Sequence, residues 1–240
     1  MRAILAAALF ALSSSVAFAT SLEDSAKALY KLHSNDRAIC SAVAVSPTQL
    51  VTAAHCISPD LSIRVYNEGF DRRGEKWEVR SYSSYSVTVV RTDSKGDVAF
   101  LELLAPDVAL KPIDIADAYA PKFGDRLIAI GYPRTDELTL TDGMFTATVA
   151  LPIPGFNAPF WKTTVPITGG SSGGALIRDF GDSDYRLIGL TTANYRDVSF
   201  QSYFSTVERL NAVVAGLLGK AVVAEAAPAV KPGDMSTDGR

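Results

Sequence analysis

The sequence predicts an antiparallel all-β fold, a sandwich or a barrel, followed by one C-terminal helix. Runs of about four to nine residues, rich in Val, Ile, Thr, Tyr and Phe, recur along most of the chain. Gly, Pro, Asn, Asp and Ser separate these runs, and these residue types favour turns. Near the end of the chain the apolar residues change to the spacing of a helix.

The elements follow from these patterns in chain order. Residues 20–32 have a helix-compatible pattern, with their apolar side chains roughly on one stripe. The expected strands are 38–46, 49–53, 62–67, 76–82, 86–92, 97–103, 126–131, 136–141, 143–151, 161–166, 174–178, 185–192 and 198–204. Residues 206–218 form the clearest helix, with Gly219 at its end. Residues 114–125 are the best candidate for a linker between two halves.

The two ends of the chain differ from its body. Residues 1–19 have a positive start, an apolar run over 3–12 and an A-x-A pattern at 17–19, which together predict a cleaved secretory signal peptide. The alternative is a membrane anchor, but the serines at 13–15 interrupt the run too early to span a bilayer. Residues 221–240 are rich in Ala, Pro and Gly, and we expect a flexible tail.

Composition excludes several classes of function. The net charge is −3, from 23 basic and 26 acidic residues, so nucleic acid is not an expected partner. A zinc site drawing on four Cys or His ligands would need Cys40, Cys56, His33 and His55 together, and their spacing matches no common pattern. We therefore expect no metal and no cofactor. His33 lies among polar residues, and we expect it on the surface.

The two cysteines have two interpretations. In an exported protein, Cys40 and Cys56 can form a disulfide, and closing a loop of about 15 residues is worth about 3 kcal/mol. The disulfide would hold the segment that bears His55 against the preceding strand. The alternative is a pair of free, buried thiols.

Three short segments combine residue types that can carry chemistry. They are TAAHC at 52–56, DVAFL at 97–101 and GGSSGGA at 169–175. Each has an ordinary structural interpretation, since glycines favour turns and an aspartate at a strand edge is commonly a turn residue. The third segment also matches G-x-S-x-G of the α/β-hydrolases, but those enzymes need a later histidine and none follows His55. It lacks the Lys-Ser/Thr of a phosphate loop.

The three segments resemble the chymotrypsin/trypsin-like serine proteases, whose patterns TAAHC, D-[IV]-A-L-L and G-D-S-G-G-P occur in the same order. The Cys40–Cys56 pair resembles the disulfide beside the catalytic histidine of that family. The resemblance extends over about residues 38–218. It implies two antiparallel β-barrels of the trypsin-like type, at 38–118 and 119–220, the second including the C-terminal helix. Residues 20–37 precede them as an N-terminal segment.

The resemblance also implies a role for each site residue. His55 would be the general base and then the general acid, Asp97 would fix its tautomer, and Ser172 would be the nucleophile. The backbone N–H groups of Gly170 and Ser172 would form the oxyanion hole. Ser171 is the rival nucleophile, although the register of the motif favours Ser172. The implied protein is a secreted or periplasmic serine endopeptidase that acts on polypeptides. The alternatives are an inactive relative that binds proteins and an esterase with the same triad.

The sequence departs from the family at the residue before the nucleophile. Zymogen-type members have an aspartate there that pairs with a newly cut N-terminus, but this chain has Ser171 and no Ile-Val-Gly-Gly segment before Ala38. Activation by insertion of a new N-terminus is therefore not expected. We expect an enzyme that is competent after signal removal, or one that is controlled through residues 20–36.

The resemblance places a substrate pocket at five residues, which are Pro166, Thr191, Thr192, Ala193 and Asn194. Proline at the pocket floor gives no support for selecting Arg or Lys. Thr191 stands where glutamyl endopeptidases commonly have a histidine, so selection of Glu is not supported either. Asn194 replaces a common glycine and would narrow the entrance. We expect a preference for a medium-sized apolar or uncharged residue.

Overall fold

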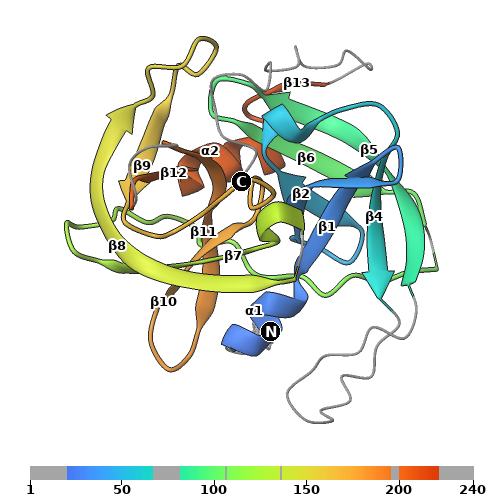
Figure 1. Ribbon diagram of the computed structural model, residues 1–240, viewed down its shortest axis with the longest axis horizontal. Coiled ribbons are helices and arrows are strands. Elements are labelled where there is room, and N and C mark those ends of the chain that lie inside the picture. Colours follow the sequence, from blue (N-terminus) through green and yellow to red (C-terminus); the bar gives the residue numbers. More distant parts are fainter. Residues whose placement is uncertain (1–20, 67–81, 106, 136, 196–199, 222–240) are drawn as a thin grey trace, which may run out of the picture.

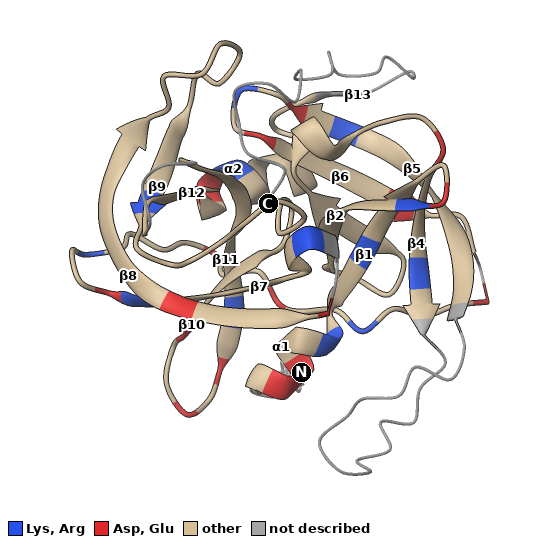
Figure 2. Cartoon of the chain, viewed as in Figure 1, with Lys and Arg blue, Asp and Glu red and all other residues tan. Residues whose placement is uncertain are grey.

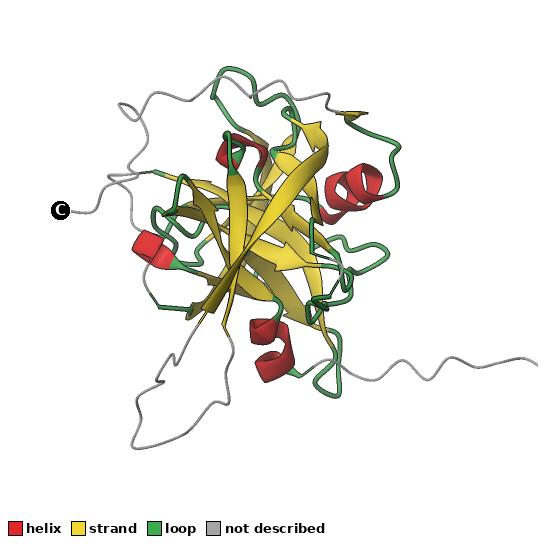
Figure 3. Ribbon diagram, turned by 90° about the vertical axis from the view of Figure 1, so that its right-hand side faces the viewer, coloured by secondary structure: helices red, strands yellow, loops and turns green. Residues whose placement is uncertain are grey.

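The computed structural model describes residues 21–66, 82–105, 107–135, 137–195 and 200–221, and its strands form two closed antiparallel barrels (Figure 1). Strands occupy the middle of the molecule and the helices lie at its margins (Figure 3). The predicted all-β fold with two barrels and a C-terminal helix is confirmed. The predicted signal peptide lies outside the described residues, as does nearly all of the predicted tail.

The first barrel is built from the N-terminal half of the described chain. Its strand order is β5-β4-β1-β2-β3-β6, closed by pairing of β5 with β6, and β13 pairs with the C-terminal end of β5. The strands are β1 (Leu29–Ser34), β2 (Arg37–Ala44), β3 (Gln49–Thr52), β4 (Leu61–Tyr66), β5 (Tyr82–Asp93), β6 (Val98–Leu103) and β13 (Lys220–Ala221).

The second barrel follows with the order β10-β11-β12-β9-β8-β7. Its strands are β7 (Arg126–Gly131), β8 (Thr139–Ala150), β9 (Pro159–Thr163), β10 (Ala175–Asp179), β11 (Tyr185–Asn194) and β12 (Ser202–Ser205). The helices are α1 (Leu22–Lys27) and α2 (Val207–Val214), with short 3-10 turns η1 (Ala54–Cys56) and η2 (Pro133–Thr135). None of the helices in the described ranges has the length and apolar character that a bilayer crossing requires.

The N-terminal segment differs from its predicted structure. Residues 20–32 were expected to be compatible with a helix, but α1 ends at Lys27 and β1 begins at Leu29. Strand β1 pairs with β2 on one side and β4 on the other, and it buries Leu32. Pairing on both sides satisfies the backbone and overrides local helix preference.

His33 lies on β1 and is 1% exposed, so its predicted surface position is wrong. The side chain is buried because β1 is a central strand of the first barrel. Burial and the nearby Arg64 guanidinium lower the pKa of His33 below its ordinary value.

Other element boundaries also differ from the prediction. Two strands were expected around Gly143, but β8 runs through it without a turn. A Cβ atom on Gly143 would lie 2.6 Å from the backbone nitrogen of Val165, so glycine here permits close approach of the chain. Helix α2 ends at Val214 rather than 218, and Gly216 follows with φ +77. Of the expected strand 76–82, only Tyr82 is described.

One of the hydrophobic clusters contains residues of both barrels. It contains Val43 and Phe100 from the first barrel, Ile130 and Ile177 from the second, and Leu210 from α2. Helix α2 therefore seals the junction of the barrels, in the upper centre of Figure 1. Charged residues of both signs are spread over both barrels (Figure 2). This shared cluster fixes how the two barrels lie relative to each other. The spacing between His55 on the first barrel and Ser172 on the second depends on that arrangement.

Candidate active site

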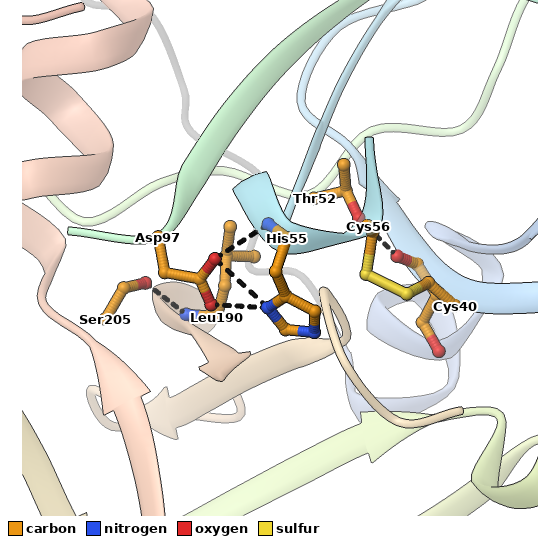
Figure 4. Close-up of polar contacts among 8 residues, drawn as sticks. Cys40, Thr52, His55, Cys56, Asp97, Leu190 and Ser205 are labelled. Carbon is orange, nitrogen blue, oxygen red and sulfur yellow. Dashed lines mark hydrogen bonds and ion pairs between the residues drawn. A yellow bond between two sulfur atoms is a disulfide. The ribbon is translucent and has the colours of Figure 1, made fainter. Parts of the chain in front are cut away.

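The segment that bears His55 is fixed by the strand before it and by a disulfide directly after it. Strand β3 leads into η1, which contains His55, and Ala53 and Ala54 are buried just before it. Cys40 on β2 and Cys56 form the predicted disulfide (Figure 4). The His55 side chain remains 22% exposed, so its ring can reach a substrate.

Asp97 binds His55 through both of its carboxylate oxygens. One oxygen accepts the His55 backbone N–H at 2.9 Å, and the other lies 2.9 Å from Nδ1 of the ring (Figure 4). Asp97 is 0% exposed and has φ +56, immediately before β6. Because a carboxylate accepts hydrogen bonds, this contact places the ring proton on Nδ1 of the neutral imidazole and leaves Nε2 as a proton acceptor.

The surroundings of His55 favour its charged form overall. Burial disfavours protonation, but the charge of Asp97 and its hydrogen bond favour it, and the pKa of His55 is raised above its ordinary value. The raised pKa makes the neutral imidazole of His55 a stronger acceptor for the proton of a hydroxyl.

The serine loop distinguishes its two adjacent serines. The N–H of Ser171 donates to the carbonyl of Thr168 at 3.1 Å, and Gly170 has φ +86 inside that turn. Ser171 is buried, at 6% exposure, whereas Ser172 is half-buried. Exposure therefore favours Ser172 over Ser171 as a group that meets a substrate.

Two backbone N–H groups in this loop are available to an anion. The carbonyl of Gly169 accepts from Arg134 N at 2.5 Å, and the carbonyl of Ser171 accepts from Gly174 N at 2.9 Å. In a trans peptide the N–H points opposite to the C=O, so these bonds set the directions of the N–H groups of Gly170 and Ser172. Neither N–H has an acceptor within the described part of the chain.

The serine loop contacts the histidine half of the molecule through the backbone. Ser41 N donates to the carbonyl of Ser172 at 2.8 Å. A Cβ atom on Gly173 would overlap Thr52 and the carbonyl of Ser41, so only glycine lets the loop approach the first barrel this closely. No hydrogen bond joins the Ser172 hydroxyl to His55 among the described residues, and such bonds are commonly long before a substrate binds.

The residues predicted for the substrate pocket lie in two places. Pro166 and Thr191 line a cavity of about 210 Å³, together with Ser171 and residues from the end of β7 and the start of β8. Thr192 and Ala193 are buried on β11, and they do not line that cavity. The amide of Asn194, at the end of β11, donates to the carbonyl of Ile167 at 3.2 Å.

The Asn194 contact connects the end of β11 to the segment that precedes the serine loop. Strand β11 lies against that loop, since Gly173 N donates to the carbonyl of Thr191 at 2.8 Å. Asn194 is three residues further along β11, and Ile167 is five residues before Ser172. The Asn194 side chain therefore contacts a residue that lines the cavity together with Ser171 and Thr191. The sequence named Asn194 but not its partner, because no sequence signal marks the Ile167 carbonyl.

Comparison with known proteins shows the family. The profile of the trypsin-like peptidase domain matches residues 40–190, which is more than half of the chain and includes His55, Asp97 and Ser172. The chain belongs to the trypsin-like peptidase family. The resemblance predicted from the three motifs is thus confirmed.

Similar members of this family include bacterial serine endoproteases. The chain is 32% identical over 112 residues to the serine endoprotease DegS of Salmonella typhimurium, covering 46% of this chain and 30% of that protein. It is 34% identical over 113 residues to the periplasmic serine endoprotease DegP of Escherichia coli K12, covering 45% of this chain and 22% of that protein. The chain thus spans less than a third of the length of these curated relatives.

Solved structures agree on the trypsin-like fold. The active form of the Rv3671c protease from Mycobacterium tuberculosis superposes with a TM-score of 0.63 at 21% identity, covering 84% of this chain and 86% of that one. A serine endoprotease from Yersinia pestis gives a TM-score of 0.62 at 23% identity, covering 81% and 64%. Both matches extend over most of the described residues.

Proposed function

We propose that this protein is an exported serine endopeptidase that cleaves polypeptides through an acyl-enzyme intermediate. The observation that carries the proposal is the buried Asp97 carboxylate, which binds both the backbone N–H and the ring of His55. A buried carboxylate is costly unless it is paired, and here its partner is a ring whose second nitrogen is left as a base. Membership of the trypsin-like peptidase family supports the same conclusion.

The proposed mechanism uses groups that the site contains. His55 Nε2 removes the proton of Ser172 Oγ as that oxygen attacks the carbonyl carbon of the peptide bond. The negative oxygen of the tetrahedral intermediate accepts hydrogen bonds from the N–H groups of Gly170 and Ser172. Protonated His55 then gives its proton to the leaving amine. Water, activated by the same imidazole, hydrolyses the acyl-enzyme and releases Ser172.

The proposed substrates have a small, uncharged side chain on the acyl side of the cut. Asn194 bonds to Ile167, which lines the cavity together with Ser171, and we expect this contact to limit the space for that side chain. No acidic residue is among the five pocket positions predicted from the sequence, so a basic side chain would have no partner there. We therefore expect the protease to prefer a small residue on the acyl side of the cut, rather than the medium-sized residue that the sequence predicts.

Export is part of the proposal. Residues 1–19 have the pattern of a signal peptide, and the DegP relative is named as a periplasmic protein. The Cys40–Cys56 disulfide fits an oxidising compartment.

A protein-binding relative without activity is the second candidate. It is favoured by one observation, the lack of a hydrogen bond between Ser172 and His55 among the described residues. Cleavage of a peptide library by the wild type, Ser171→Ala and Ser172→Ala separates the two functions. We expect the wild type and Ser171→Ala to cleave and Ser172→Ala to be inactive. Cleavage by none of the folded proteins would favour the binding function, and cleavage by Ser172→Ala would exclude Ser172 as nucleophile.

A further inference from the structure

Ser41 is a fully buried residue on β2 that no step of the proposed mechanism uses. Its hydroxyl donates to the carbonyl of Gly170 at 3.0 Å and accepts from the backbone N–H of Tyr132 at 2.9 Å. Its own N–H donates to the carbonyl of Ser172 at 2.8 Å. One side chain and one backbone N–H thus bind two carbonyls of the serine loop and connect it to the end of β7.

Along the chain, the two carbonyls that Ser41 binds alternate with the two N–H groups proposed for the oxyanion hole, those of Gly170 and Ser172. The peptide unit of the Gly170 carbonyl lies between the unit that carries Gly170 N–H and the unit that carries Ser172 N–H. The Ser172 carbonyl belongs to the next unit along the chain. Gly170 has φ +86 and no side chain, so its own bonds restrict rotation of these units only weakly. The hydroxyl of Ser41 adds a restraint on the Gly170 carbonyl, in the same peptide unit as the Ser171 N–H that bonds to Thr168.

Ser41 also contacts the segment of the base. Its carbonyl accepts from the hydroxyl of Thr52 at 2.7 Å, and Thr52 is three residues before His55. The preceding residue, Cys40, is bonded to Cys56, directly after His55. All four hydrogen-bonding groups of Ser41 are therefore satisfied, and they reach the serine loop, the end of β7 and the histidine segment.

We propose that Ser41 is a positioning residue that holds the N–H groups of Gly170 and Ser172 in the geometry that binds an oxyanion. This inference rests on the proposed protease function. A hydrogen bond in such a site acts only when its donors are directed at the position of the developing charge. Loss of the Ser41 hydroxyl removes this partner from the half-buried Gly170 carbonyl and from the buried Tyr132 N–H, so the loop is expected to relax away from that geometry.

The test is Ser41→Ala. We expect kcat to fall by about 10- to 100-fold with KM within about threefold, because the loss concerns the transition state rather than substrate binding. Affinity for a peptide boronic acid, whose tetrahedral adduct places an oxygen between the two N–H groups, is expected to fall by the same factor. Affinity for the amine product, which has no oxygen from the cleaved carbonyl, is expected to stay unchanged.

Ser205→Ala is the matched control. Ser205 on β12 is also fully buried, and its hydroxyl accepts the backbone N–H of Leu190 on β11 at 3.0 Å rather than binding a group of the serine loop (Figure 4). We expect this variant to lose thermal stability comparably and to keep kcat within about twofold, since surrounding packing is preserved. Equal losses of kcat in both variants would assign Ser41 a merely structural role and overturn the proposal.

A second substitution keeps the test decisive. Ser41→Thr retains the hydroxyl, and we expect its kcat within about threefold of the wild type. If Ser41→Ala does not fold, Ser41→Cys, which replaces the hydroxyl by a weakly hydrogen-bonding thiol of similar shape, takes its place in the same comparison. Wild-type-like kcat in the variant without the hydroxyl overturns the role of Ser41 alone, because the protease function then still stands. A wild type that cleaves no peptide overturns the proposed function itself.

Discussion

Asp97 and His55 determine how the proposed activity responds to pH. The imidazole has to be neutral to accept the proton of Ser172, and Asp97 raises the pKa at which it becomes neutral. Activity is therefore absent at low pH and appears as the pH rises through that pKa. The midpoint is expected above the ordinary histidine value of 6.5, which is higher than the sequence alone predicts.

The first prediction concerns Asp97→Asn. Without the carboxylate charge, the pKa of His55 falls, so the midpoint of kcat/KM against pH moves to lower pH. We also expect kcat to fall by roughly 10⁴-fold, because the amide favours the wrong tautomer of the ring. Initial rates from pH 5 to 9 measure both effects. An unchanged midpoint would mean that another group, and not His55 beside Asp97, controls the profile.

The second prediction concerns Asn194→Gly. We expect loss of the side chain that bonds to Ile167 to enlarge the cavity that Ile167 and Ser171 line. We expect kcat/KM for peptides with Phe or Leu before the cut to rise about tenfold relative to peptides with Ala, since an extra apolar group in a hydrophobic pocket contributes about 1–3 kcal/mol. Ratios from competing peptides measure the change. A constant ratio would show that Asn194 does not limit the pocket.

At the scale of elements, the site depends on loops that approach each other without side chains between them. Gly173 has φ +75, and a Cβ atom there would lie 2.8 Å from the backbone nitrogen of Ala53, besides overlapping Thr52 and Ser41. The left-handed conformation and the close approach both require glycine. The serine loop can therefore not carry a side chain at this position and keep its contact with the first barrel.

The third prediction compares Gly173→Ala with Gly124→Ala. Both glycines have positive φ, but no atom lies within 4 Å of a Cβ on Gly124. We expect Gly124→Ala to cost about 1 kcal/mol of unfolding free energy from the backbone alone. Gly173→Ala should cost about 2 kcal/mol more and abolish cleavage, because the loop has to move. Urea unfolding and a peptidase assay measure the two effects. Equal costs would contradict the described packing of the loop.

The sequence predicted most elements and the order of the site residues, and its failures have physical causes. Strands such as β6 and β7 contain continuous apolar runs. Because such a run is visible in the local sequence, these strands could be predicted. Strand β1 was missed because its stability comes from pairing with two other strands, and His33 was placed wrongly for the same reason.

The contacts that complete the site could not be predicted from local patterns. The Ser41 hydroxyl bonds to a carbonyl 129 positions away, and Asn194 bonds to one 27 positions away. Backbone carbonyls have no signature in the amino-acid sequence. The family resemblance of the three motifs predicted that Asp97 lies beside His55. Ser41 belongs to none of these motifs.

At the scale of the whole molecule, one hydrophobic cluster fixes the position of the two barrels relative to each other. Leu210 of α2 packs in the same cluster as Phe100 of the first barrel and Ile177 of the second. The histidine and the serine come from different barrels, so their spacing depends on this junction. The Asp93–Arg209 ion pair adds a link between β5 and α2.

The fourth prediction concerns Leu210→Ala. Leu210 is 0% exposed, and we expect the unfolding free energy to fall by about 2–5 kcal/mol in a single cooperative transition. Leu217→Ala is the control, because Leu217 is 80% exposed and its truncation should cost less than about 0.5 kcal/mol. Two separate transitions, of which only one responds to Leu210→Ala, would contradict a shared core.

The central claim is that Ser172 is a nucleophile activated by His55. Covalent labelling with a fluorophosphonate, followed by mass-spectrometric mapping of the adduct, tests it most directly. The account predicts one adduct, on Ser172, that is lost in folded His55→Ala protein. An adduct on Ser171, labelling that persists without His55, or no labelling of the folded wild type would contradict it.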